Sequence, residues 1–249
     1  MTRIIAVINH KGGVGKTTTV ATLGAALAEM GRRVLLVDLD AQCNLTTSVY
    51  NGTPERTIYD AFSEEYQLPI IPFKGSKSWA LVPSSLDLAG TELEIASRMG
   101  REYILKDLLV PVREDYDYIL LDCPPSLGLL TINALVAATE VVIPLTPEGL
   151  PATGLRRILD MVEKAKLRLN PSLTLSGILL TRWETSNLAK MVEESLRGKF
   201  PEVYKTKIRK NVRIAEAPLA HSNLLDYAPD SNGSEDYRNL AKEVDAQNR

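Results

Sequence analysis

The sequence predicts a single α/β domain of residues 1–249, built on a doubly wound, mostly parallel β-sheet with helices on both faces. First, short and nearly continuous apolar runs alternate with longer amphipathic runs, which is typical of parallel strands buried on both faces. Second, an apolar run at residues 4–8 is joined by a glycine-rich loop to an Ala- and Leu-rich helical run. Third, no break in the sequence demands a second domain.

The first half of the chain is expected to hold three strands. The helical run after the loop ends near Met30, and Gly31 follows it as glycine often follows a helix C-terminus. Pro54 in the first turn of a helical pattern indicates that a helix begins at residues 53–55. The strands expected here are residues 4–8, 32–38 and 79–83, and two more helices are expected around residues 86–99 and 102–112.

The second half continues the alternation and brings the number of strands to about seven. Strands are expected at residues 118–122, 141–145 and 175–181, with a last edge strand at residues 203–208. Helices are expected at residues 153–169, 187–197 and 234–244. Joined by right-handed crossovers, these elements form a doubly wound sheet, whose ligand site lies at the carboxyl ends of the strands.

Composition limits the classes of function. With 45% hydrophobic and 24% charged residues, the chain has the composition of a folded globular protein. Its net charge of −2 gives no overall attraction to nucleic acid, so any such binding requires a local basic patch. No N-terminal signal is evident and no apolar run approaches the ~18 residues of a membrane span, so we expect a cytoplasmic protein. Cys43 and Cys123 lack the spacing of a metal or iron–sulfur site, and we expect both to be buried and reduced.

The loop at residues 10–18, His-Lys-Gly-Gly-Val-Gly-Lys-Thr-Thr, has the residue types of a phosphate-binding loop. Glycines let the backbone turn tightly and bring N–H groups close to an anion at a helix N-terminus. Lys16 can reach the β- and γ-phosphates of ATP, and the Thr17 hydroxyl can bind Mg²⁺. The residues expected to bind the nucleotide are Lys11, Gly12, Gly13, Val14, Gly15, Lys16, Thr17 and Thr18.

Three acidic residues follow predicted strands and are expected to face the same nucleotide: Asp38, Asp40 and Asp122. Asp122 follows four apolar residues, as a Walker B acid does, and would hold Mg²⁺ directly or through water. The alternative for Asp122 is a turn or helix-capping role. Asp38 lies within the strand end, so we expect it on the magnesium side or in a structural role.

The loop departs from the common spelling G-x-x-x-x-G-K-[ST], because His10 stands where the first glycine is expected and Lys11 follows it. In this form, K-G-G-V-G-K-T-T, it resembles the deviant Walker A motif of the ParA/MinD group of ATPases. The resemblance implies that Lys11 reaches across a dimer interface to the partner's nucleotide, where it acts in catalysis together with Lys16.

Two further segments resemble the switch regions of the same family. Asp38-Leu39-Asp40-Ala41-Gln42 resembles the first switch, which implies that Asp40 orients or deprotonates the attacking water. Residues 122–128 resemble the second switch, with the N–H of Gly128 directed toward the γ-phosphate. An isolated carboxylate is a weak base, so slow turnover is expected.

Residues 205–218 resemble the family segment I-P-R-N-V-R-L-S-E-A-P, which implies that Asn211 lies by the adenine. The family's proline is Arg209 here, and a second family arginine is replaced around Thr185. Residues 197–213 contain seven basic residues and only one acidic residue, Glu202. This run is either a solvated face or a surface for DNA phosphates. The candidate DNA-binding residues are Lys199, Lys205, Lys207, Lys210 and Arg213, the last of which matches a family arginine implicated in DNA contact.

The resemblance to ParA/Soj-type partition ATPases covers nearly the whole chain. It implies an ATP-bound homodimer that binds double-stranded DNA without sequence preference, on the nucleoid. It also implies a ParB-like partner on a cargo that stimulates ATP hydrolysis and releases the dimer. The alternative is a MinD-like regulator at a membrane surface, but residues 242–249 are too polar to lie on lipid. Unpaired cysteines disfavour a metal- or electron-carrying relative, and no helix-turn-helix is expected before the first strand.

Overall fold

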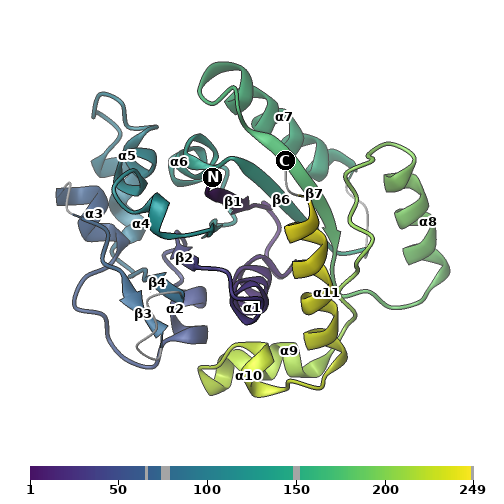
Figure 1. Cartoon of the computed structure of the whole chain (residues 1–249). Helices are drawn as coiled ribbons and strands as arrows, with labels where there is room; N and C mark the ends of the chain where they lie inside the picture. The colour runs from purple at the N-terminus through teal and green to yellow at the C-terminus, as the bar shows by residue number, and fades with distance from the viewer. Residues whose placement is uncertain (65–66, 74–78, 148–151, 248–249) are drawn as a thin grey trace.

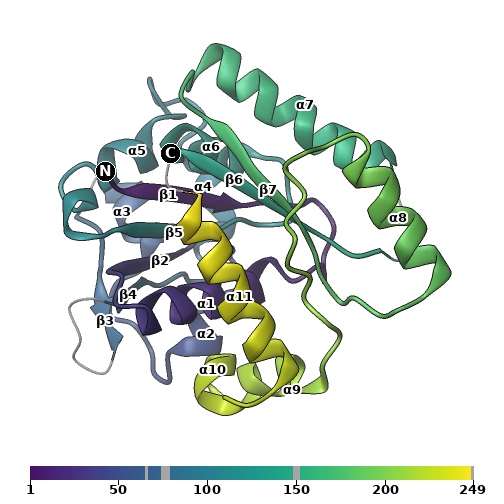
Figure 2. The same cartoon turned by 45° about the vertical axis from the view of Figure 1, so that its right-hand side comes forward.

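The computed structural model describes residues 1–64, 67–73, 79–147 and 152–247. Within them seven strands form one sheet in the order β3-β4-β2-β5-β1-β6-β7. Strand β5 is labelled in Figure 2, and the other strands also in Figure 1. Neighbouring strands are parallel except at one edge, where β3 pairs antiparallel with β4. The strands are β1 (Arg3–Val7), β2 (Val34–Asp38), β3 (Ile71–Pro72), β4 (Trp79–Val82), β5 (Tyr118–Asp122), β6 (Glu140–Leu145) and β7 (Thr174–Leu180).

Helices cover both faces of the sheet (Figures 1 and 2). One face carries α1 (Lys16–Glu29), α10 (Leu224–Tyr227) and α11 (Asn232–Ala246). The other face carries α3 (Ile58–Glu64), α4 (Leu88–Glu94), α5 (Ile104–Leu109), α6 (Leu129–Ala137), α7 (Ala152–Arg168) and α8 (Asn187–Arg197). The remaining helices are α2 (Asn44–Val49) and α9 (Val212–Glu216), with 3₁₀ turns at Arg113–Asp115 and Ala217–Ala220. No helix in the described part of the chain is both long and apolar enough to cross a bilayer.

The hydrophobic core divides into two layers because successive side chains of a strand point to opposite faces of the sheet. In β1, Ile4 and Ala6 pack with the layer that contains α6 and α7, whereas Ile5 and Val7 pack with the layer that contains α1 and α11. All four side chains are buried. Burial on both faces explains the continuous apolar strands, and the predicted doubly wound fold is confirmed.

Several predicted elements differ from the structure. The strand at residues 118–122 and the helix at residues 187–197 are confirmed residue for residue. The helix predicted from residues 53–55 is wrong at its start, because α3 begins only at Ile58. Helix α6 was missed because seven of its nine residues are buried, which leaves no alternation of apolar and polar faces.

The edge strand predicted at residues 203–208 is wrong. This segment makes only isolated bridges, between Val203 and Ile178 and between Arg209 and Trp183. Its intervening backbone N–H groups donate to carboxylates of α11, from Lys205 and Thr206 to Glu243 at 2.7 and 2.9 Å. Because these donors are used by side chains, they are not available for a β-ladder. The seventh strand is therefore β3, at the opposite edge of the sheet.

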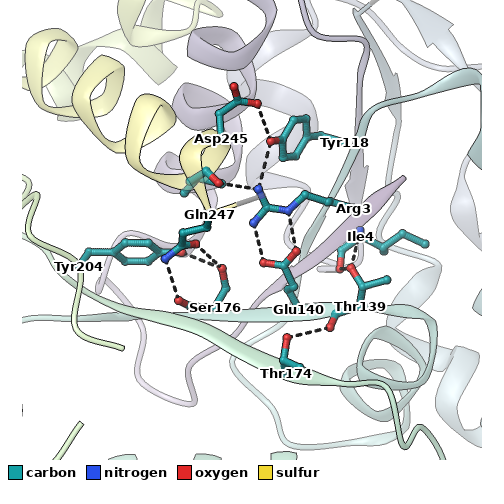
Figure 3. A network of polar contacts seen from close by, with 11 residues as sticks. Arg3, Ile4, Tyr118, Thr139, Glu140, Thr174, Ser176, Tyr204, Asp245 and Gln247 are labelled. Carbon is teal, nitrogen blue, oxygen red and sulfur yellow. Dashed lines mark hydrogen bonds and ion pairs between the residues drawn. The ribbon is translucent and has the colours of Figure 1, made fainter. Parts of the chain in front are cut away.

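At the amino ends of the strands, a polar network fastens the end of α11 to the sheet (Figure 3). The guanidinium of Arg3 forms a forked ion pair with Glu140, at 2.6 and 2.7 Å, and donates to the Tyr118 hydroxyl at 3.1 Å. Tyr118 in turn donates to Asp245 of α11 at 2.8 Å. Ser176 of β7 donates to Gln247 at 3.1 Å, just beyond that helix. The amino edge is therefore closed by structural contacts, and the loop at residues 10–18 lies at the carboxyl edge.

Candidate functional site

The loop at residues 10–18 connects β1 to α1, as the sequence predicted. Gly13 and Gly15 have φ angles of 74° and 87°, in the left-handed region that glycine adopts without strain. The loop is braced from outside by Thr181, whose hydroxyl donates to the Val14 carbonyl at 2.8 Å. Asn9 also holds the loop: its side-chain amide N–H donates to the Pro144 carbonyl at 2.7 Å, and its side-chain oxygen accepts from the backbone N–H of Lys11 at 3.0 Å.

The N-terminus of α1 is suited to an anion. No side chain caps the helix and no residue of its first turn is acidic, so its first N–H groups are open to an anion. Lys16, the first residue of the helix, is only 8% exposed, whereas Lys11 is exposed. A buried ammonium and free helix N–H groups together attract a phosphate group.

Asp122 ends β5 beside the loop. Its side chain is fully buried, and neither carboxylate oxygen has a hydrogen-bond partner among the residues that the structure describes. Burial raises the pKa of Asp122 well above its usual range, and the nearby Asp38 raises it further, while Thr17 and Lys16 act in the opposite direction. The charge of Lys16 offsets this burial only in part, so a bound cation would stabilise the ionised carboxylate further.

These residues fit a bound Mg²⁺. The two orphaned oxygens of Asp122 and the hydroxyl of Thr17 are hard oxygen donors of the kind that Mg²⁺ binds. No three His, Cys, Asp or Glu side chains in the described ranges lie close enough to hold one ion together. Magnesium usually takes one or two carboxylates and completes its shell with phosphate oxygens and water, so a single aspartate here suffices.

Asp38 and Asp40 occupy different environments. The Asp38 carboxylate, at the end of β2 and level with Asp122 in the sheet, accepts from the Thr46 backbone N–H at 2.8 Å and from its hydroxyl at 2.7 Å. Burial raises the pKa of Asp38 to about 6, although these hydrogen bonds lower it. Asp40 is partly exposed and accepts from the Gln42 N–H at 3.0 Å. Of the two roles expected for Asp38, on the magnesium side or in the structure, these contacts favour the structural one.

Asn211 lies on the segment that runs beside the last residues of the β7 strand. The Trp183 N–H donates to the Ile208 carbonyl at 2.8 Å, and the Lys210 N–H donates to the Trp183 carbonyl at 3.0 Å. The side-chain oxygen of Asn211 accepts from the Arg213 N–H at 2.9 Å and caps α9. The amide N–H groups of Asn211 are left to donate to a ligand.

The basic run at residues 197–213 is largely neutralised by acids from elsewhere in the chain. Lys207 pairs with Glu193 at 2.8 Å and lies 4.4 Å from the centre of the Trp183 ring. The sequence count missed these pairs because the acids lie outside the run. The ion pairs are Arg197–Glu193, Lys207–Glu193, Arg209–Asp236, Lys210–Glu184 and Arg213–Glu216. Lys199 and Lys205 are exposed, with no ion pair among the described residues.

Three residues of the site were not found from the sequence. Asn9 and Thr181 hold the loop, but their partners are 135 and 167 residues away, so no local pattern indicates the contacts. The carboxylate of Glu92 accepts from the Leu130 N–H at 2.9 Å, at the N-terminus of α6. There it lies against Gly128, where an added Cβ would meet it at 2.6 to 2.8 Å.

The two cysteines are free and lie in different environments. Cys123 is fully buried, and burial raises the pKa of its thiol. Cys43 is half-buried, so the prediction that both cysteines are buried is wrong for this residue. Its backbone has a φ of 54° where it precedes α2.

A glycine-rich loop between the first strand and the first helix, followed by a buried lysine and a strand-end aspartate, defines a P-loop nucleotide-binding protein. A family model described as an AAA domain matches residues 2–175. The chain is 44% identical to the sporulation initiation inhibitor protein Soj of Bacillus subtilis, over 99% of each chain. It is 40% identical to the chromosome partitioning protein ParA of Myxococcus xanthus, over 97% of this chain and 87% of the relative. The chain therefore belongs to the ParA/Soj family of P-loop ATPases.

Solved structures agree with this membership. The cobyrinic acid a,c-diamide synthase of Mycobacterium smegmatis, solved with bound ADP and magnesium, matches with a TM-score of 0.84 at 35% identity, over 97% of this chain and 93% of that one. The septum site-determining protein MinD of Pyrococcus horikoshii, complexed with Mg-ADP, matches with a TM-score of 0.79 at 28% identity, over 98% and 96%. The predicted P-loop fold is thus confirmed.

Proposed function

We propose that the chain binds Mg²⁺·ATP in the loop at residues 10–18 and hydrolyses it to ADP and phosphate. The buried, unpaired carboxylate of Asp122 beside Lys16 and Thr17 carries this proposal, because its burial is costly without a cation. Magnesium would supply positive charge that offsets the charge of the phosphates. The loop residues 11–18 would bind the phosphates, Thr17 and Asp122 would hold the metal, and Asn211 would bind the base.

Isothermal titration with Mg²⁺·ATP tests the binding, with Lys16→Ala as the matched variant. We expect the wild type to bind ATP and Lys16→Ala to lose most of the affinity, because Lys16 is the buried cation of the loop. Omission of magnesium should weaken binding in the wild type. Equal affinity of the two proteins for ATP would refute the assignment of the loop.

Asp40 is proposed to orient the attacking water. The water oxygen bonds to the γ-phosphorus while the bond from that phosphorus to the β,γ-bridging oxygen breaks, and the water's proton leaves to a phosphate oxygen or to solvent. The partial exposure of Asp40 supports a role at the surface of the site and slow turnover without a stimulating partner. Asp40→Ala should therefore bind ATP without hydrolysing it, as a phosphate-release assay would measure.

Lys11 is proposed to complete the site of a second copy of this chain. Its exposed side chain and the backbone tether to Asn9 support this, because the lysine projects from a fixed point. We expect Asp40→Ala to elute as a dimer in ATP and magnesium and as a monomer in ADP, and Lys11→Ala to remain monomeric. A monomer of Asp40→Ala in saturating ATP would contradict the dimer.

DNA binding is proposed for the ATP-bound dimer, through Lys199, Lys205, Lys207, Lys210 and Arg213. The exposure of Lys199 and Lys205 supports it, while the other three must exchange carboxylates for phosphates. Each lost phosphate contact should flatten the salt dependence of log K by about 0.9. Affinity for DNA in ATP that is unchanged in the double variant Lys210→Ala, Arg213→Ala would refute their part in it.

The biological role proposed is partition of a DNA or protein cargo on the nucleoid, with a ParB-like partner that stimulates hydrolysis. The similarity to Soj and ParA supports it. A MinD-like membrane role is disfavoured because the apolar residues of α11, Tyr237, Leu240 and Val244, are buried against the fold. Pelleting with liposomes should leave the protein in the supernatant, whereas a DNA-coated surface should retain it in ATP.

A further inference from the structure

Arg209 binds helix α11 at the position where the family segment has proline. Its backbone N–H donates to the Asp236 carboxylate at 2.8 Å, a bond that proline cannot make. Its guanidinium donates from Nε to both oxygens of Asp236 at 3.0 Å and from Nη2 at 2.6 Å. A further bond of 2.6 Å reaches Glu235. The side chain of Asp236 is 8% exposed and that of Arg209 is 41% exposed, so water reaches the pair from the arginine side only.

The opposite side of the same segment contacts the residues just after β7, which brace the phosphate loop. Trp183 brackets residue 209 with two backbone hydrogen bonds, and Thr181, two residues earlier, bonds the Val14 carbonyl. Helix α11 is itself joined to α1, since the hydroxyls of Tyr237 and Thr19 lie 3.3 Å apart. Arg209, two residues before Asn211, is therefore held by α11 on one side and by Trp183 on the other. Both contacts connect to the phosphate loop, the first through α1 and the second through Thr181.

We propose that Arg209 is a positioning residue for the base of the nucleotide. By fixing the backbone ahead of Asn211, it sets where the Asn211 amide N–H groups meet the base, relative to the phosphates bound in the loop. It thus raises affinity for ATP through the base and not through the phosphates. This inference rests on the base contact assigned to Asn211 under the proposed function.

The test compares Mg²⁺·ATP with Mg²⁺·tripolyphosphate, which carries the phosphates and no base. In Arg209→Ala, affinity for ATP should fall about tenfold, equivalent to about 1.4 kcal/mol, while affinity for tripolyphosphate changes by less than about twofold. Both variants keep the backbone N–H bond to Asp236, but Arg209→Lys also keeps the positive charge and lacks only the fork, so its loss should be intermediate. Glu235→Gln is the matched control, because it removes only the outer, exposed partner and should bind both ligands as the wild type does.

Asn211→Ala distinguishes the base contact of Asn211 from the positioning role of Arg209. If it lowers affinity for ATP selectively while Arg209→Ala does not, the positioning role of Arg209 is overturned and the base contact stands. If Asn211→Ala leaves the ratio of the two affinities unchanged, the base contact fails and the role of Arg209 fails with it. Equal loss of both ligands in Arg209→Ala, at a circular dichroism spectrum like that of the wild type, would assign Arg209 a general structural role and overturn the proposal.

Discussion

Substitution of Gly177 by alanine should destabilise the protein strongly, because the added methyl group clashes with the buried ring of Tyr204. Gly177 lies in β7, where the ring of Tyr204 packs directly against its Cα. An added Cβ would overlap the Cε2 atom of the ring and lie 2.6 and 2.7 Å from two further ring carbons, whereas carbon atoms pack at about 3.5–4.0 Å. Tyr204 is 2% exposed, so its ring has no free space to enter.

The magnitude has two parts. Forcing a methyl group into a filled core costs about 1–3 kcal/mol. Displacing the ring also breaks the hydrogen bond between the hydroxyls of Tyr204 and Ser176, 3.0 Å apart and buried, which costs about 1 kcal/mol more. We therefore expect the free energy of unfolding to fall by about 2–4 kcal/mol, and Tm to fall by about 5–15 °C at this chain length.

Urea denaturation followed by far-ultraviolet circular dichroism measures this loss. Gly90→Ala is the matched control, since Gly90 lies inside α4 and its added Cβ would meet only the flexible end of Glu94, at 3.4 Å. The control should be stabilised by about 0.5–1 kcal/mol, as alanine favours a helix interior. A loss below about 1 kcal/mol in Gly177→Ala would show that the ring moves freely and would refute the reasoning.

Three further predictions follow from other contacts. The pKa of Asp38 is raised to about 6, so its stabilising contribution is complete below about pH 4 and is lost as the pH rises through 6. In magnesium-free buffer, the free energy of unfolding of the wild type should therefore fall by about 3 kcal/mol relative to that of Asp38→Asn between about pH 4 and 7. Urea titrations at each pH would show this fall. Gly15→Ala should lose ATP binding in calorimetry and about 1–2 kcal/mol of stability, because the φ of 87° strains any L-residue. Glu140→Gln should lower the free energy of unfolding by about 1–3 kcal/mol, since Arg3 would keep a buried charge with its ion pair removed. It should also speed amide hydrogen exchange at the end of α11, and unchanged exchange there would contradict a fastening role.

The sequence predicts the central strands well because burial on both faces leaves them uniformly apolar, as in Ile119, Leu120 and Leu121. The same property hides α6, whose buried residues show no helical period. The edge is predicted wrongly because Glu243, distant in the sequence, takes the N–H groups of Lys205 and Thr206. Local patterns cannot report a competitor that lies almost forty residues along the chain.

For the candidate site, local sequence predicts the groups that act at the loop and not those that hold it. Lys16 and Thr17 stand in a motif, and Asp122 follows a strand, so the structure brings together residues that spacing alone could place. Thr181 and Asn9 depend on how distant strands align. The free charge of the basic run was overestimated for the same reason, since Glu184 and Glu216 neutralise it only in the folded chain.

The position of α11 has a consequence for the order in which the protein can fold during synthesis. This helix is synthesised long after α1, yet its Tyr237 and Leu240 cover the same core layer as Val20 and Leu23 of α1. Until residues 232–246 have left the ribosome, that face of α1 stays open to water and to other chains. That face of α1 is therefore completed only when residues 232–246 have emerged, well after the phosphate loop itself has been made.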